Sequence, residues 1–297
     1  HALVDSVRGI SESGSKYIAS DATTQELTST NMPSSLEANG FFVQGGGGRT
    51  NTNNESYVSW VFKGGGDAVS NTDGSITSQV SANTDAGFSI VKWTGDATSN
   101  PTVGHGLNQE PDLYIVKELD NGTVSWLVGG NSTLFPETAS TASFLRINTT
   151  DDIDQTGIDT FGNSGQNLIK VGARTNNGED SIAYCFHSVS GYSKIGSYDG
   201  SSSSQRIYVT DDGTSSGSGG FEPSWVMIKR TDTTGNWIIY DKPRGNGDIE
   251  LYPDSTSAES NASSVRGRTF EADGFTLDNS HSAYNTSGGD FIYMAFK

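Results

Sequence analysis

The sequence lacks several features that define common protein classes. Among its 297 residues there is 1 cysteine, Cys185, so no disulfide forms within the chain. No run of 18 apolar residues occurs, and we therefore expect no membrane insertion. Charged residues make up 18% of the chain, and 12 residues are leucine. The salt-bridged, leucine-rich helices of bundles and Rossmann-like folds are therefore missing.

Basic residues are also scarce. The chain has 18 Lys and Arg against 35 Asp and Glu, a formal net charge of −17. Such a surface repels phosphate backbones and anionic lipid head groups wherever it is not locally basic. Because no Lys/Arg cluster occurs, we expect no nucleic-acid partner.

Small polar residues take the place of the missing helix formers. The chain has 37 glycines, and stretches of Gly, Ser, Thr, Asn and Asp alternate with short runs of Val, Ile and aromatic residues. This pattern is typical of many short strands joined by turns, and it predicts an all-β protein. The one candidate helix, from Ser20 to Leu27, is weak.

The two ends of the chain resemble each other. Residues 36–41 (LEANGF) and 57–63 (YVSWVFK) match residues 270–275 (FEADGF) and 291–297 (FIYMAFK) with the same spacing. Self-similarity of this kind is the signature of repeated structural units.

A further copy lies between them. Residues 110–117 (EPDLYIVK) match residues 222–229 (EPSWVMIK), and residues 181–187 match the last seven residues of the chain. Single residues align as well: Trp126 with Trp237, Trp60 with Tyr184 and Met294, and Asp5, Arg8 and Gly9 with Asp241, Arg244 and Gly245.

We therefore expect tandem β-sandwich modules, jelly-roll or lectin-like, with very little helix. The first unit, residues 1–63, is the C-terminal half of a module, and residues 64–86 form a Gly/Ser/Asn-rich linker or long loop. The second unit, 87–187, and the third unit, 191–297, are whole modules that pack against each other. A half sandwich leaves strand edges and an apolar face in water. We expect upstream residues or another chain to supply the missing strands, and the protein to be a homo-oligomer.

Turn signals place hairpins inside the modules. A strand from Trp225 to Lys229 and a strand from Trp237 to Tyr240 flank a turn at 231–235. The dipeptides at 39–40 (NG) and 273–274 (DG) are turns that lead into strands containing phenylalanine.

The four histidines and one cysteine form no metal or nucleophilic set by spacing. Residues 213–217 (GTSSG) match the Gly-x-Ser-x-Gly spacing of hydrolases, but residues 218–220 (SGG) follow in place of a helix, so we expect a flexible loop there. We therefore expect a non-enzymatic protein with no cofactor. Calcium is the alternative, at Asp151, Asp152 and Asp154 or at Asp211 and Asp212. The flanking Tyr184 and Phe186 predict that Cys185 is a buried thiol, and the flanking glycines predict that His105 is a turn residue.

Aromatic residues and loop tips remain as candidate contact sites. Recurrence at matching positions predicts that Trp60, Trp126 and Trp237 are core residues, whereas Trp93 and Trp225 fit a surface position as well. The loop tips at 45–49 and 278–285 are candidates for contact with a partner. The candidate ligand-contact residues are Arg49, Trp93, Asp278 and His281.

A set of short motifs runs along the chain: residues 83–91 (NTDAGFSIV), Thr94-Gly95, 103–107 (VGHGL), Pro111-Asp112 and 115–117 (IVK), with 5–9 (DSVRG), 39–41 (NGF) and 62–63 (FK). With these motifs the chain resembles a repeat of unassigned function found in virion structural and tail-fibre-like proteins of marine bacteriophages, and the last three motifs resemble the second half of that repeat. The resemblance covers essentially the whole chain as two and a half copies, and it brings no catalytic residues with it.

This resemblance implies a bacteriophage virion surface protein, a fibre, appendage or decoration component that acts as a structural or adhesive module in host attachment. Its partners would be other virion proteins, a second copy of itself and host surface glycans, and its location the virion surface or the extracellular space. A bacterial extracellular adhesin or carbohydrate-binding module is the alternative. A polysaccharide depolymerase that uses a pair of carboxylates is a third.

Overall fold

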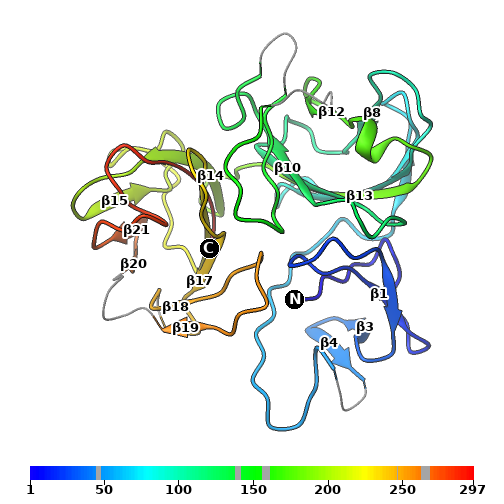
Figure 1. Cartoon of the computed structure of the whole chain (residues 1–297), viewed down its shortest axis with the longest axis horizontal. Helices are drawn as coiled ribbons and strands as arrows, with labels where there is room; N and C mark the ends of the chain where they lie inside the picture. Colours follow the sequence, from blue (N-terminus) through cyan, green and yellow to red (C-terminus); the bar gives the residue numbers. More distant parts are fainter. Residues whose placement is uncertain (45–47, 138–141, 156–160, 246, 262–267) are drawn as a thin grey trace.

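The computed structural model describes residues 1–297 except 45–47, 138–141, 156–160, 246 and 262–267. It is an all-β structure whose one helical turn among the described residues is the 3-10 helix η1 (Ala173–Thr175). Figure 1 shows three lobes around a common centre: the first unit in blue, the second in cyan and green, and the third in yellow to red. Both chain ends lie near this centre.

The second unit has two antiparallel sheets. The larger one has six strands in the order β10-β9-β13-β7-β6-β5, and the smaller one has three in the order β11-β12-β8. The bounds are β5 (Val69–Asn71), β6 (Ser78–Asn83), β7 (Phe88–Thr94), β8 (Thr102–Gly104), β9 (Leu113–Glu118), β10 (Leu127–Gly130), β11 (Gly162–Asn163), β12 (Leu168–Lys170) and β13 (Asp180–Phe186).

The third unit also has a larger and a smaller sheet, and a short two-stranded one. Their orders are β14-β22-β16-β17, β15-β21-β20 and β18-β19. The bounds are β14 (Ser193–Asp199), β15 (Gln205–Tyr208), β16 (Trp225–Arg230), β17 (Ile238–Asp241), β18 (Ile249–Glu250), β19 (Ser260–Asn261), β20 (Arg268–Glu271), β21 (Gly274–Leu277) and β22 (Asp290–Phe296).

The first unit is built of two hairpins. Strand β1 (Ser15–Tyr17) pairs with β2 (Leu27–Ser29), and β3 (Pro33–Glu37) pairs with β4 (Gly40–Val43). The expected hairpins at β16-β17, at β20-β21 and at β3-β4 are therefore confirmed.

The two larger sheets share one strand order. Counted along the chain, the strands of the four-stranded sheet lie in the order third, second, fourth, first, and strands β7, β9, β10 and β13 of the second unit do the same. In both sheets the last strand of the unit is central, with the first and second strands on its two sides.

Two expectations about local structure are wrong. Residues 64–86 are more than a linker, because they hold β5 and β6, which extend the second unit's larger sheet beyond β7. The buried hydroxyls of Ser78 and Ser81 donate to the carbonyls of Gly104 and Gly66. These two polar residues of β6 are therefore buried without leaving a hydroxyl group unpaired. Residues 20–27 form turns and the start of β2 instead of a helix.

Each larger sheet is buried on both faces. On β13, Ala183 and Cys185 face a cluster shared with the smaller sheet of the second unit, which includes Val103 and Ile169. On β22, Phe291, Tyr293 and Ala295 face the corresponding cluster of the third unit. These clusters are the sandwich cores of the two units, and the opposite faces of β13 and β22 need another cover.

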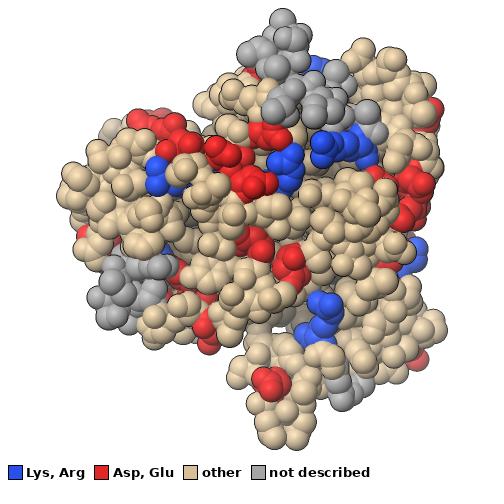
Figure 2. All heavy atoms as spheres, viewed as in Figure 1, with Lys and Arg blue, Asp and Glu red and all other residues tan. Residues whose placement is uncertain are grey.

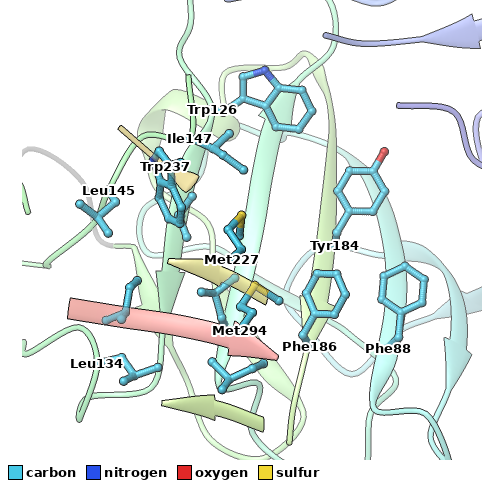
Figure 3. Close-up of a cluster of buried hydrophobic side chains, with 14 of the residues drawn as sticks. Phe88, Trp126, Leu134, Leu145, Ile147, Tyr184, Phe186, Met227, Trp237 and Met294 are labelled. Carbon is cyan, nitrogen blue, oxygen red and sulfur yellow. The ribbon is translucent and has the colours of Figure 1, made fainter. Parts of the chain in front are cut away.

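That cover is a central core to which all three units contribute. Its buried members are Ile18, Phe88, Ile90, Leu113, Leu119, Trp126, Val128, Leu134, Phe135, Leu145, Ile147, Ile182, Tyr184, Phe186, Ile195, Met227, Trp237, Ile239, Ile292, Met294 and Phe296. In Figure 3, Met227 and Met294 lie between Trp237 on one side and Phe186 on the other. Trp126 and Trp237 are 0% and 1% exposed, as expected for core residues.

Three phenylalanines from matching sequence positions meet inside this core. The ring centroids of Phe62 and Phe296 are 5.1 Å apart, those of Phe62 and Phe186 are 5.7 Å apart, and those of Phe186 and Phe296 are 6.0 Å apart. Aromatic pairs at such distances add to the free energy gained by burial. The three rings therefore hold the three lobes together at one point.

Matching backbone pairs occur in all three units. Leu3, Val128 and Ile239, which stand at matching sequence positions, each form an isolated antiparallel bridge to a residue further along their own unit. Each bridge has two backbone hydrogen bonds of 2.8–3.1 Å, from Leu3 to Ile18, from Val128 to Leu145 and from Ile239 to Leu251. The same backbone bridge thus occurs in each lobe, at residues that contribute to the central core or pack against it.

Polar contacts between lobes also repeat. Asp5 binds Arg8 in its own unit and accepts a hydrogen bond of 2.8 Å from the Tyr184 hydroxyl of the second unit. Asp241 binds Arg244 and accepts one of 2.9 Å from Trp60 Nε1 of the first unit. Trp60 and Tyr184 align in the repeats, so one kind of junction joins two pairs of lobes.

Replacing Phe186 with alanine tests the central core. Phe186 is 6% exposed and touches three other rings, so Phe186→Ala should lower the free energy of unfolding by about 3–5 kcal/mol. Chemical denaturation followed by tryptophan fluorescence measures the loss. Phe42, which is 60% exposed, is the matched control, and equal effects of Phe42→Ala and Phe186→Ala would contradict the importance of the core.

Candidate functional site

A cavity of about 260 Å³ opens on the third unit. Three segments that are distant in sequence form it: the turn between β16 and β17, the residue Tyr252 after β18, and the loop between β21 and β22. The lining residues are Thr234, Gly235, Asn236, Ile238, Tyr252, His281, Ser282 and Ala283.

Lys229 fixes the turn that forms one wall. Its ammonium group is buried and donates to the carbonyl oxygens of Gly235, at 2.8 Å, and of Thr150 in the second unit, at 3.2 Å. Burial lowers the pKa of Lys229 to about 8. Lys117 stands at the matching position of the second unit and donates to Glu118, Asn121 and Val124 carbonyls, so a buried lysine holds both turns.

Asn285 and Arg230 fix the loop that forms the opposite wall. The buried amide of Asn285 donates to the carbonyls of Ser203 and Asn279 and accepts from the backbone of Ser201. Arg230 donates to the carbonyl of Ser282 at 3.0 Å. The side chains that this loop presents to the cavity therefore stand on a braced backbone.

The wall combines rings with short polar groups. The imidazole of His281 stacks on the Tyr284 ring, with centroids 5.1 Å apart and planes at 13°, and its Nδ1 accepts a hydrogen bond from the Ala283 backbone. The Tyr252 hydroxyl donates to Glu250 at 2.6 Å, so this tyrosine lines the cavity with a fixed ring. Hydroxyl and amide groups of Thr234, Asn236 and Ser282 supply donors and acceptors.

One carboxyl group lies beside the cavity in a partly buried position. Asp254 accepts a hydrogen bond of 3.1 Å from Asn236, while its other oxygen has no hydrogen-bond partner among the described residues. Burial, the larger effect, raises the pKa of Asp254 to about 6, against the attraction of the Lys229 charge. A carboxyl group with such a pKa beside a cavity is a feature of binding and catalytic sites.

The structure separates the four residues that the sequence singled out as ligand contacts. His281 lines the cavity, and Asp278 is exposed in the same loop. Arg49 is exposed on the first unit with its guanidinium 5.7 Å from the Tyr17 ring centroid, and residues 45–47 of that loop lie outside the described residues. The prediction that Trp93 contacts a ligand is wrong, because Trp93 is 2% exposed and its Nε1 donates to the Thr175 carbonyl.

The remaining candidates have structural roles. Cys185 is buried, and burial raises its pKa to about 12. His105 is buried in its turn, where Nδ1 accepts from Leu107, and burial lowers its pKa to about 4. Trp225 is half-buried against Trp60, with ring centroids 6.2 Å apart.

The acidic loops considered for calcium are bound to other groups. Arg146 forms ion pairs with Asp154 at 2.7 Å and Asp151 at 3.5 Å, and Asp212 caps its own turn by accepting from Thr214. Within the part of the chain that the structure describes, no group of three or more His, Cys, Asp or Glu side chains is placed to hold a metal ion.

Most of the cavity could not be predicted from the sequence. Thr234, Tyr252 and His281 are far apart along the chain, and only the strand order of the third unit brings them together. The one usable signal was the polar loop tip at 278–285.

A family model described as a domain of unknown function (DUF7483) matches residues 1–297. The chain belongs to the DUF7483 family. Comparison with curated proteins gave no match, and neither did comparison with solved structures. Among the described residues of this DUF7483 protein, no helix has the length and apolar character to cross a membrane.

Replacing Asp254 with asparagine should change the pH dependence of stability. With a folded pKa of about 6 against an ordinary 3.8, the folded protein binds more protons at Asp254 than the unfolded chain does between these pH values. The stability contributed by this group therefore falls as the pH rises through that window. Asp254→Asn should unfold at a higher temperature than the parent above about pH 6 and at the same temperature below about pH 4.

Thermal unfolding across that pH range measures the effect. The exposed Asp278 in the neighbouring loop is the control, since Asp278→Asn removes the same charge without changing a buried group. A difference between Asp254→Asn and the parent that stayed constant with pH would contradict a shifted carboxyl pKa.

Proposed function

We propose that the chain is a non-enzymatic bacteriophage virion surface protein, a fibre, appendage or decoration component that acts as a structural and adhesive module. The observation that carries this proposal is the central core, which joins the three lobes and leaves their loops on the outside. An arrangement of this kind suits a spacer or a platform for surface loops.

The arrangement of the lobes supports a repeat of two and a half copies around a pseudo-threefold axis. Three aligned phenylalanines meet in the centre, matching backbone bridges occur in all three units, and the two larger sheets have the same strand order. Contacts also pass from lobe to lobe in one direction: Trp126 of the second unit donates to Ala19 of the first, and Trp237 of the third donates to Arg146 of the second. The resemblance to virion repeats is consistent with such an arrangement.

The surface charge supports an extracellular, protein- or sugar-facing role over a nucleic-acid one. Acidic side chains lie on all three lobes of the face in Figure 2, and the formal net charge is −17. An anionic surface of this kind favours solubility at the outside of a particle and disfavours phosphate-rich partners.

Host surface glycans are the ligand class that we propose for the cavity of the third unit. Its rings at Tyr252 and His281 and its hydroxyl and amide groups are of the kind that contact the faces and hydroxyls of a sugar. At about 260 Å³ the cavity is smaller than the sites that enclose a drug-sized ligand, so we expect it to take one sugar residue of a longer chain.

Three experiments separate this proposal from the alternatives. A virion protein sediments with purified particles, is detected in them by mass spectrometry, and is encoded beside capsid or tail genes. A cell-surface adhesin would instead be recovered from the bacterial envelope. Release of reducing sugar from host capsule, lost on replacement of Asp254 and a nearby carboxylate, would show a depolymerase and overturn the non-enzymatic proposal.

Glycan binding should depend on the cavity residues. Ser282→Ala and His281→Ala should each weaken retention of the protein on host glycan arrays several-fold, because each removes a group from the wall. Ser280→Ala is the matched control, since Ser280 is exposed in the same loop and does not line the cavity. Thermal unfolding should be unchanged in the two serine variants, whereas His281→Ala also loses the stack on Tyr284 and should unfold at a lower temperature. Equal glycan binding by Ser282→Ala and Ser280→Ala would exclude the cavity as the glycan site.

A further inference from the structure

Residues 57–63 have the side-chain pattern of a strand without the pairing of one. The side chains at 57, 59, 61 and 63 are exposed, whereas those at 58, 60 and 62 are half-buried. This alternation is that of an extended segment with one face covered. Figure 1 draws the segment in light blue without a strand arrow, and no strand of the described residues pairs with it.

The covered face is firmly held. Trp60 donates to Asp241 at 2.9 Å, and Phe62 packs against Phe88, Phe186 and Phe296 in the central core. The segment therefore presents its other face and its edges from a fixed position.

Its backbone has few partners. Among the described residues, no backbone hydrogen bond joins residues 57–62 to another segment. The aligned strands β13 and β22 are paired along both edges, with β7 and β9 and with β14 and β16. An extended segment with unpaired N–H and C=O groups is a template for a strand from another chain.

The outward face is apolar in the places where β22 is covered. Tyr57 is 49% exposed and Val61 is 71% exposed, whereas the aligned Phe291 and Ala295 are 1% and 0% exposed in the sandwich core of the third unit. Tyr57 and Val61, which we call the open face, therefore lack the apolar cover that the third unit has at the same positions.

The pattern of charge along the segment favours a second copy of the same chain as the partner strand. If two copies pair antiparallel with Ser59 opposite Ser59, then Tyr57 of each lies opposite Val61 of the other, and Glu55 opposite Lys63. Both terminal positions then join opposite charges, and both inner positions join an aromatic ring to a β-branched side chain. A twofold axis through Ser59 satisfies both halves at once.

We propose that the segment 55–63 is the interface of a homodimer, in which it pairs antiparallel with its counterpart and the open faces of the two copies pack side by side across the strands. This interface is independent of the proposed function, since it holds for a virion protein and for an adhesin alike.

Cross-linking at the axis tests the register. Ser59→Cys places two thiols opposite each other at the separation of directly facing strand residues, which is within the range of a disulfide. Mild oxidation should convert most of this variant to a covalent dimer. Ser70→Cys, on the exposed edge strand β5, is the matched control, and the native Cys185 is buried. Cross-linking of the two variants at the same rate would overturn the proposal.

Sedimentation of the full chain tests the association itself. The parent should be a dimer, and Val61→Lys should raise the dissociation constant about tenfold or more, because it removes the β-branched side chain that packs across the strands against the Tyr57 ring. Val61 is exposed in the single chain, so the unfolding temperature of the dissociated protein should not change. Val69→Lys, at a position that is 65% exposed on β5, is the control and should leave the dimer intact.

A monomeric parent would overturn the proposal. The peptide of residues 221–230 (FEPSWVMIKR), which contains β16, then identifies the other class of occupant. If the monomer binds this peptide, and Val61→Lys abolishes that binding, the open face takes a strand of the repeat itself instead of a second copy.

Discussion

Contact among Phe62, Phe186 and Phe296 is the constraint on which the rest of the structure depends. Each ring is the next-to-last residue of its unit, so the last segments of the three units must converge at one point. Once β13 and β22 are fixed there, the antiparallel pairing on both of their edges places β7, β9, β14 and β16. The positions of the larger sheets follow from this one cluster.

Convergence at the centre makes unusual demands on the strands. Because β13 and β22 are buried on both faces, they need an almost continuous apolar run, which a chain with 32% apolar residues supplies in few places. In the remaining strands, burial of a polar residue costs least when its polar group is hydrogen-bonded, as the hydroxyls of Ser78 and Ser81 are. Lys117 and Lys229 follow the same rule, since backbone carbonyls take up the hydrogen bonds of each buried ammonium group.

Elements determined by a few neighbouring residues could be predicted from the sequence, whereas elements that depend on distant residues could not. Hairpins at 39–40 and 273–274 could be predicted because Asn-Gly and Asp-Gly determine the turn within a few residues. Strand β6 could not, because its serines have the composition of a loop and its pairing with β7 depends on contacts across the turn between them. Trp93 was misplaced for a similar reason, since η1, which supplies its hydrogen-bond acceptor, lies far along the chain. His281 was singled out as a loop-tip residue, but its neighbours in the cavity depend on the order of the strands, which composition does not encode.

The division into an inner and an outer layer has an evolutionary consequence. The inner layer, which is the central core, is shared by the three units, so a substitution there must fit residues of all three at the same time. The outer sandwich cores and the loops above them belong to one unit each. Change is therefore expected to accumulate in the outer layers, one lobe at a time, while the centre drifts slowly. Under selection to recognise new surfaces, the loops of one lobe can change while the folds of the other two lobes stay the same.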